Sequence, residues 1–322
     1  MDPQIAAFKL EGLCAAHFQP FDPKTGDVDN ASIALHVAEL RRQGVSSVFT
    51  TGTTAEGVKL SVAERKSVLE AWVAAARASE PPLTVIAHVG AESVRDAMDL
   101  AAHAQAVGAA AAGLVAPSYF KPGDIAACVA LLEAVAAKCD KLPLYWYSIP
   151  SMSGVAVRSD LLLKRVAQLQ DSEARLRSVR GVKFSEPDLH IFSNCINVAG
   201  GRFDCLYGKD EQGLGALAMG ARGFIGSTYN YVGRAANAMI AAFRAGDMAG
   251  ALAAQRKVMA VVDLLYQSGE YGPAGCNVGK AIMELRLGGA GCGPARLPGY
   301  SVSDEGRAKL KADLERIGFF EM

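Results

Sequence analysis

The chain of 322 residues is long enough for one large α/β barrel with an extension, or for two ordinary domains, and either would bury an ample core. Its 33 basic and 33 acidic residues cancel, so the net charge gives no reason to expect nucleic acid or a membrane surface as a partner. Small molecules and sister subunits are the expected partners.

The seven cysteines are scattered without C-x-x-C spacing, and their number is odd. This usage is typical of reduced thiols and predicts a cytoplasmic protein. The first ten residues lack the basic and apolar regions of a secretory signal. The alanine-rich run 101–116 contains His103 and Gln105 and precedes Pro117, so we expect a helix followed by a strand there rather than a membrane segment.

Strands and helices are predicted to alternate from the first buried run, 10–21, onward. Asn30 is expected to cap a helix that runs to about Gln43 and stops at Gly44. Ser61 and Glu64 have the spacing of a capping box. The remaining predicted elements are strand 46–51, helix 61–78, strand 83–89, helix 93–107, strand 111–116, helix 122–138, strand 142–150, helix 159–169, a strand carrying Lys183, helix 187–198, strand 203–207, helix 211–219, strand 223–226 and helix 234–244.

Eight strand and helix pairs with continuously apolar strands indicate a parallel sheet, and eight is the number that closes a (β/α)8 barrel, or TIM barrel. A doubly wound open sheet is the alternative, but no G-x-G-x-x-G follows the first strand. We therefore expect a barrel over 1–246 and a C-terminal helical extension over 247–322. The extension contains predicted helices at 248–267, 277–287 and 303–317, and the Gly/Pro-rich segment 288–299 is expected to be a rigid connector.

Lys183 lies between Val182 and Phe184 in the sixth predicted strand. A buried ammonium group costs several kcal/mol, on the order of 3–5, unless it is paired or loses its proton, and loss of the proton makes an amine nucleophile. The alternative is a lysine that extends its amine to solvent. Lys280 and Lys209 are rival amines, but neither has such apolar flanks.

Other polar residues follow the strands, where the active site of a barrel is expected. Thr53 and Thr54 could bind a carboxylate through hydroxyl and backbone N–H groups, although an ordinary turn is an alternative. Tyr147 could relay protons beside an amine or could simply pack in its strand.

Three further candidate residues follow the seventh and eighth strands, together with Gly208. Asp210, Glu211 and Ser227 would suit a polyhydroxylated substrate, while the two acids could also be favoured by a helix dipole. The five histidines show no metal-binding spacing and no G-x-S-x-G motif occurs, so neither a metal nor another cofactor is expected.

Four motifs resemble the pyruvate-dependent class I aldolases, the family that includes the dihydrodipicolinate synthases and the sialic acid aldolases. They are G-T-T-A-E-G at 52–57, Y-S-I-P at 147–150, G-V-K-F-S at 181–185 and G-S-T-Y-N-Y at 226–231. The resemblance covers nearly the whole chain. The matches L-Y-G-K-D-E-Q, V-K-F-S-E-P-D-L and G-P-A-R-L-P make it greatest toward the sialic acid aldolases.

The resemblance implies a carbon-carbon lyase that reversibly cleaves N-acetylneuraminate to N-acetylmannosamine and pyruvate. Lys183 would form a Schiff base with pyruvate, and Tyr147 would transfer protons. Thr53 and Thr54 would hold the pyruvate carboxylate. The resemblance also implies a homotetramer in which Tyr119 reaches toward a neighbouring subunit's site. The remaining implied substrate-binding positions are Ser185, Gly208, Asp210, Glu211 and Ser227.

Three positions depart from the family pattern. Ala55 replaces a glycine, which matters if that position needs a positive φ. Ser148 replaces the usual asparagine, and Met152 stands where the synthases carry an arginine, which argues against synthase activity. Two alternatives stay open: an aldolase or dehydratase for another 2-keto-3-deoxy sugar acid, and a pyruvate-binding barrel with impaired catalysis.

Overall fold

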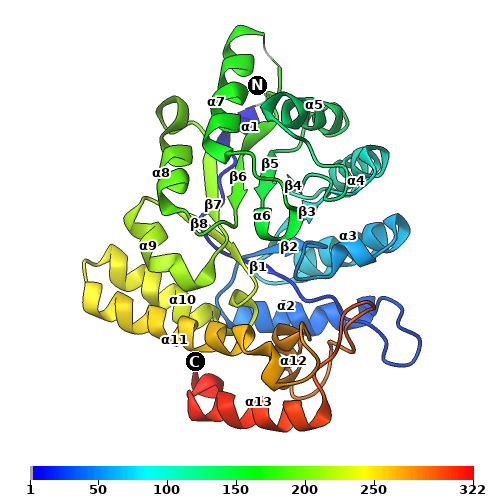
Figure 1. Ribbon diagram of the computed structural model, residues 1–322, viewed down its shortest axis with the longest axis vertical. Helices are drawn as coiled ribbons and strands as arrows, with labels where there is room; N and C mark the ends of the chain where they lie inside the picture. Colours follow the sequence, from blue (N-terminus) through cyan, green and yellow to red (C-terminus); the bar gives the residue numbers. More distant parts are fainter. Residues whose placement is uncertain (1–2, 174) are drawn as a thin grey trace. The chain divides into compact units, whose positions relative to one another are not determined.

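The computed structural model of the protein describes residues 3–173 and 175–322. Eight strands form a closed parallel barrel in the order β1 to β8, which confirms the predicted TIM barrel (Figure 1). Each strand whose bounds were predicted begins and ends within five residues of them. The strands are β1 Gly12–Ala16, β2 Ser47–Thr50, β3 Thr84–His88, β4 Ala111–Leu114, β5 Leu144–Ser148, β6 Val179–Phe184, β7 Asp204–Tyr207 and β8 Gly223–Gly226.

The helices alternate with these strands and continue beyond them. They are α1 Pro3–Ala7, α2 Ile33–Arg42, α3 Val62–Ala78, α4 Val94–Val107, α5 Ile125–Ala136, α6 Pro150–Ser153, α7 Ser159–Ser172, α8 Leu189–Asn197, α9 Gly213–Ala218, α10 Tyr229–Arg244, α11 Met248–Tyr266, α12 Val278–Arg286 and α13 Asp304–Arg316. Every residue of strands β2, β4 and β5 is buried, as expected for a parallel sheet covered by helices. No helix described in the ranges 3–173 and 175–322 has the length and apolar character needed to cross a membrane.

Short polar side chains start most of the helices. The predicted capping box before α3 is confirmed, since the Glu64 N–H donates to Ser61 Oγ and the Ser61 N–H donates to Glu64 Oε2. The predicted cap at Asn30 is wrong. Asp29 accepts the N–H groups of Ala31 and Ser32, and a short 3-10 turn precedes α2.

Two other helices begin away from their predicted positions. Helix α5 begins at Ile125, later than Pro122, because Asp124 supplies the capping carboxylate. Helix α10 begins at Tyr229 rather than Arg234, and its first turn is buried and irregular at Val232. Burial of this turn, and not a capping signal in the sequence, sets where the helix starts.

The described residues form two compact units, one of 3–11, 84–173 and 175–225 and the other of 12–83 and 226–322. In the first unit α4, α5, α7, α8 and α9 pack against one another in chain order (Figure 1). In the second unit α10 packs on α2 and α11, and α12 contacts α10, α11 and α13. The helices after residue 246 therefore belong to the same unit as β1 and β2.

Candidate active site

Lys183 lies near the carboxyl end of β6 and is only 4% exposed, while its neighbours Val182 and Phe184 are fully buried. This placement excludes the alternative of a lysine whose amine extends to solvent. Glycine is required two residues earlier, at Gly181, because a Cβ there would lie 1.7 Å from the carbonyl oxygen of Asp204 on β7. The close approach of β6 and β7 thus explains the glycine in the R-G-V-K segment.

A shift in strand register places Lys183 beside Tyr147. Leu144 of β5 pairs with Val179, but the next residue, Tyr145, pairs with Gly181, so β6 has one extra residue at this point. The shift brings Tyr147 into register with Lys183. Because side chains alternate along a strand, the same strands without this bulge would turn the lysine to the other face.

The amine of Lys183 lies over the aromatic face of Tyr147. The Nζ atom is 3.5 Å from the centroid of the ring, within the distance at which an ammonium group is attracted to an aromatic face. The edge-to-face contact of His88 with the same ring, at 6.0 Å between centroids and 89° between planes, fixes the ring from another side. The structure therefore joins a buried amine and a phenol in one packed group.

Glu186 lies beside this group and was not among the predicted site residues. Its Oε1 accepts hydrogen bonds from the Ser148 hydroxyl at 2.5 Å and the Ser159 hydroxyl at 3.4 Å. Burial raises the pKa of Glu186, and the two serine hydroxyls partly offset this shift. The signal in the sequence was an acid just beyond the buried strand of Lys183. Ser148, the departure from the family asparagine, is what contacts it.

Ser185 and Gly208 meet where β6 and β7 end. A Cβ at Gly208 would lie 2.1 Å from Ser185 Oγ, so a larger residue there would displace the serine hydroxyl. Asp210 and Glu211 follow in the 3-10 turn Asp210–Gln212, where Asp210 is buried and Glu211 forms an ion pair of 2.7 Å with Lys209. Both acids lie in the first turn, as the dipole argument expects, and Lys209 has a carboxylate beside it.

Thr53, Thr54 and Ser227 line one pocket of about 260 Å³ in the second unit. Thr53 and Thr54 follow β2, and Ser227 directly follows β8. Phe18, two residues after β1, and Leu265 of α11 form two further walls of the pocket. Residues 276–279, which lead into α12, form the rest. The structure thus brings three predicted substrate-binding residues together and adds a contribution from the C-terminal helices.

Backbone strain in the loop after β2 lies on both sides of Ala55, and not at Ala55 itself. Thr51 and Glu56 have φ values of +50° and +57°, whereas Ala55 is fully buried and does not have a positive φ. The glycine of the family pattern is therefore not needed for backbone conformation at this position.

Lys280 is as buried as Lys183, with 3% exposure, which its sequence neighbours did not predict. Its Nζ lies 3.2 Å from the Glu56 carboxylate. Burial lowers the pKa of Lys280, and the nearby Glu56 carboxylate opposes that shift. Lys280 thus has a carboxylate partner, and its Nζ also lies 4.1 Å from the centroid of the Phe21 ring.

Tyr119 is 82% exposed, and its ring contacts the exposed ring of Phe120 edge to face at 5.0 Å. Its backbone N–H donates to Glu92, which fixes the turn that presents the two rings. Across residues 3–173 and 175–322, no three His, Cys, Asp or Glu side chains are grouped so that they could hold a metal ion.

Residues 9–317 match the model of the dihydrodipicolinate synthetase family. The chain belongs to this family. N-acetylneuraminate lyase of Mus musculus is 39% identical to it over 97% of the chain and 93% of the relative, and N-acetylneuraminate lyase A of Xenopus laevis is 41% identical over 92% and 93%. The solved structure of Proteus mirabilis N-acetylneuraminate lyase is 32% identical and superimposes with a TM-score of 0.87 over 97% of the chain and all of that structure.

This member of the dihydrodipicolinate synthetase family thus has similarity to named lyases that extends through both the barrel strands and the C-terminal helices. The resemblance inferred from the four motifs is confirmed.

Proposed function

We propose that the protein is a class I aldolase that reversibly cleaves N-acetylneuraminate to N-acetylmannosamine and pyruvate. The observation that carries this proposal is the buried amine of Lys183, 3.5 Å from the ring centroid of Tyr147. Relatives about 40% identical that are named N-acetylneuraminate lyases support the choice of substrate.

Lys183 acts as the nucleophile. Its neutral amine adds to the keto carbon of the open-chain sugar acid, and loss of water leaves an iminium ion. The electron pair of the breaking carbon-carbon bond flows into this iminium, which produces an enamine instead of a free carbanion. Protonation of the enamine and hydrolysis then release pyruvate and restore the amine.

Tyr147 transfers the proton that cleavage requires. The hydroxyl that becomes the aldehyde of N-acetylmannosamine must lose its proton as the carbon-carbon bond breaks, and a phenolate or a phenol relay beside the amine can accept it. We expect Tyr147→Phe to keep the ring packing against His88 and Lys183 while lowering kcat by about 10² to 10⁴-fold, the usual contribution of a general acid or base.

The substrate-binding roles divide between two kinds of group. Thr53 and Thr54 hold the pyruvate carboxylate with hydroxyl and backbone N–H donors, and no full positive charge is needed. The hydroxylated tail of the sugar acid is bound by Ser185, Gly208, Asp210, Glu211 and Ser227. Buried acids such as Asp210 are suitable acceptors for sugar hydroxyls.

Location and assembly also belong to this proposal. All seven cysteines are buried and form no disulfide, which supports a cytoplasmic protein. The exposed rings of Tyr119 and Phe120 support a homotetramer, since a neighbouring subunit would cover them.

Reductive trapping tests the mechanism. Incubation with pyruvate and cyanoborohydride should add a pyruvyl group to Lys183 that mass spectrometry locates on that residue, and pyruvate should be released from N-acetylneuraminate. Lys183→Met should abolish both, whereas Lys209→Met, which replaces a rival amine, should preserve the adduct. An adduct on another lysine would refute the role of Lys183, and turnover of a different sugar acid in preference to N-acetylneuraminate would refute the substrate.

A further inference from the structure

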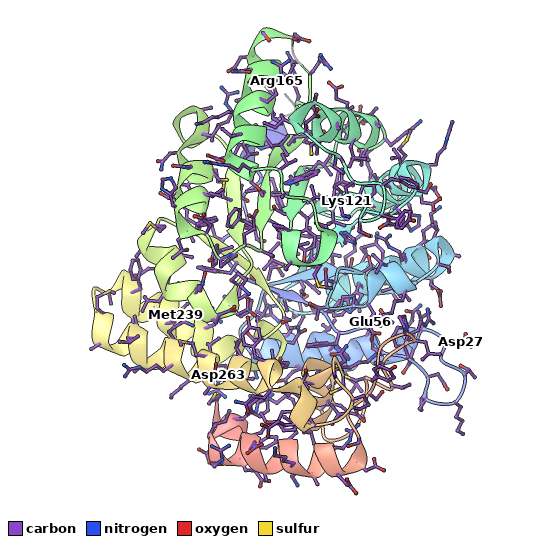
Figure 2. All side chains as sticks on the ribbon, viewed as in Figure 1. Asp27, Glu56, Lys121, Arg165, Met239 and Asp263 are labelled. Atoms are coloured by element: carbon purple, nitrogen blue, oxygen red, sulfur yellow. The ribbon has the colours of Figure 1, made fainter. Side chains whose placement is uncertain are left out.

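Glu56 occupies the loop between β2 and α3, two residues after Thr54 (Figure 2). It is 6% exposed and has a left-handed φ of +57°, a conformation that is strained for a residue with a Cβ. Thr51, at the start of the loop, has the same kind of strain with φ +50°. Such strain persists only where the surroundings enforce the conformation.

Backbone hydrogen bonds close this loop around the two threonines. The Gly57 N–H donates to the Gly52 carbonyl at 3.0 Å, and the Glu56 N–H donates to the Thr53 carbonyl at 3.0 Å. A Cβ at Gly57 would lie 1.8 Å from the carbonyl oxygen of Thr51, so the two ends of the loop are in contact. The backbone of Glu56 is thus bonded directly to that of Thr53, within the same closed loop as Thr54.

Three donors hold the carboxylate of Glu56. Lys59 lies in the same turn, while Lys280 and Arg296 lie far along the chain. Its Oε1 accepts from Lys280 Nζ at 3.2 Å, and its Oε2 accepts from Lys59 Nζ at 2.8 Å and from the Arg296 N–H at 3.0 Å. Lys280 belongs to α12, and Arg296 belongs to the Gly/Pro-rich connector that follows it. The loop is thus fixed to the C-terminal helices through one buried carboxylate.

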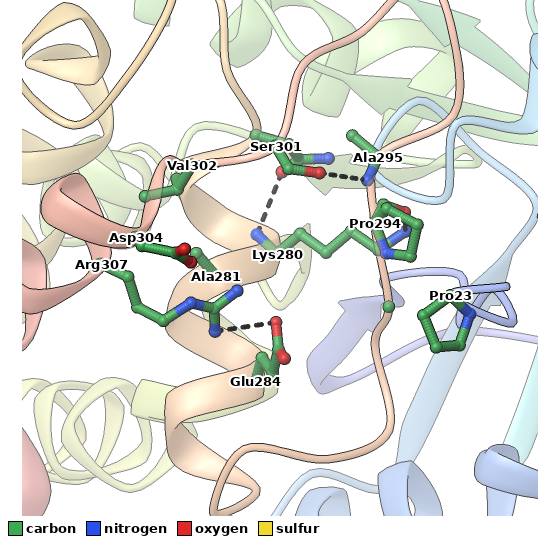
Figure 3. Close-up of a pocket in the computed structure, with 12 residues that line it drawn as sticks. Pro23, Lys280, Ala281, Glu284, Pro294, Ala295, Ser301, Val302, Asp304 and Arg307 are labelled. Carbon is green, nitrogen blue, oxygen red and sulfur yellow. Dashed lines mark hydrogen bonds and ion pairs between the residues drawn. The ribbon is translucent and has the colours of Figure 1, made fainter.

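The donors are themselves fixed. Lys280 Nζ also donates to the Pro294 carbonyl at 2.8 Å, and Lys59 Nζ donates to the Arg296 carbonyl at 2.8 Å. The Phe21 ring lies 4.1 Å from Lys280 Nζ. Figure 3 shows the Lys280 side chain running from α12 to the connector beside Pro294, along a cavity of about 310 Å³ that Glu284 and Arg307 also line.

We infer that Glu56 is a positioning residue, whose ion pair with Lys280 holds Thr53 and Thr54 in the conformation that binds the substrate carboxylate. This inference rests on the carboxylate-binding role proposed for the two threonines. It gives the C-terminal helices a part in the reaction, because Lys280 and the connector set the shape of a loop that contacts substrate. Glu56 itself acts through the loop and touches neither the substrate nor the reacting atoms.

The experiment compares two keto compounds in the cyanoborohydride trapping reaction. Pyruvate has the carboxylate that the threonines would bind, and pyruvamide carries a neutral amide in its place. In Glu56→Gln we expect the pyruvate concentration for half-maximal trapping to rise about tenfold, because binding to a misplaced loop is lost in ground and transition states alike. The half-maximal concentration of pyruvamide should change much less, and the extent of trapping at saturating pyruvate should match wild type.

Matched variants separate positioning from general damage. Glu284→Gln breaks the 3.0 Å ion pair between Glu284 and Arg307, which lies in the same helical extension. This control should leave the half-maximal concentrations of both pyruvate and pyruvamide unchanged. If Glu56→Gln does not fold, Lys59→Met is the alternative, because it removes the partly exposed donor to Glu56. It should raise the pyruvate concentration for half-maximal trapping by about threefold. The double variant with Glu56→Gln and Lys280→Met removes both buried charges and should recover stability without recovering pyruvate affinity.

The outcomes are distinguishable. No adduct in wild type at saturating pyruvate would refute the proposed function. A wild-type adduct together with equal half-maximal pyruvate concentrations in wild type and Glu56→Gln would refute the positioning role alone. An equal shift for pyruvate and pyruvamide would also refute it, since that result means a structural effect on the whole barrel.

Discussion

His17 makes the stability of this protein depend on pH. It is fully buried directly after β1, its Nδ1 donates to the Phe18 carbonyl, and its Nε2 accepts the Thr51 N–H at 3.1 Å. These two bonds define a neutral ring with its proton on Nδ1. Burial is the largest cause, and the charge of a protonated His36 the second, of the lowering of the His17 pKa from 6.5 to about 3.

The sign and size of the effect follow from the two pKa values. Between pH 6.5 and 3 the unfolded chain binds a proton at this position and the folded chain does not, so stability present above pH 6.5 is lost as the pH falls. Going from pH 7.5 to 5.0 should cost about 2 kcal/mol for His17, from 1.5 pH units at 1.36 kcal/mol each. His36, whose burial lowers its pKa to about 4, should cost a similar amount.

Urea unfolding of wild type and His17→Gln at pH 7.5 and 5.0 measures this contribution. Glutamine can replace both hydrogen bonds without titrating, so the loss in unfolding free energy over this range should be about 2 kcal/mol smaller in the variant than in wild type. Burial raises the pKa values of Glu186 and Asp204, so these carboxyl groups contribute more to the free energy of unfolding as the pH falls. Their contribution is equal in wild type and variant and cancels in the comparison. Equal losses in wild type and variant would refute a neutral buried His17.

Gly57→Ala and Tyr145→Phe test the packing inside each of the two units, and Gly123→Ala serves as a control. Gly57→Ala places a Cβ 1.8 Å from the Thr51 carbonyl oxygen and should lower the free energy of unfolding in urea by about 2 kcal/mol or more. At Gly123 a Cβ would meet nothing within 4 Å, so Gly123→Ala should cost less than about 0.5 kcal/mol. Similar costs for both substitutions would contradict the close approach at Gly57. Tyr145→Phe removes the phenol that donates to Asp204 at 2.8 Å inside the barrel and should cost about 1 to 3 kcal/mol, and an unchanged midpoint in thermal unfolding would show that this bond contributes nothing.

The prediction of helix ends depended on whether a local signal was present. The capping box of Ser61 and Glu64 is complete within four residues, so the start of α3 was correctly predicted. Asn30 was a plausible cap, but the neighbouring Asp29 has the geometry to accept two N–H groups. Helix α10 starts at Tyr229 because its first turn is buried, and burial depends on distant residues.

The candidate site divides in the same way. The alternation of eight strands and helices, and the single lysine among apolar residues in the sixth strand, could be predicted from sequence because both depend on short runs of neighbouring residues. It also supplied the motifs that place the chain in its family. The order of the strands around a barrel then follows from the preference for short, right-handed connections.

Which residues contact one another depends on the packing of the strands and helices, and local sequence does not show it. The register shift between β5 and β6 brings Lys183 to Tyr147, and a shift of one residue leaves no mark in an apolar strand sequence. The burial of Lys280 and its pairing with Glu56 join residues 224 positions apart. Such contacts depend on how whole helices and loops pack. The charge that pairs with Glu56 in the loop after β2 therefore comes from α12, a helix that the sequence alone describes only as part of an extension.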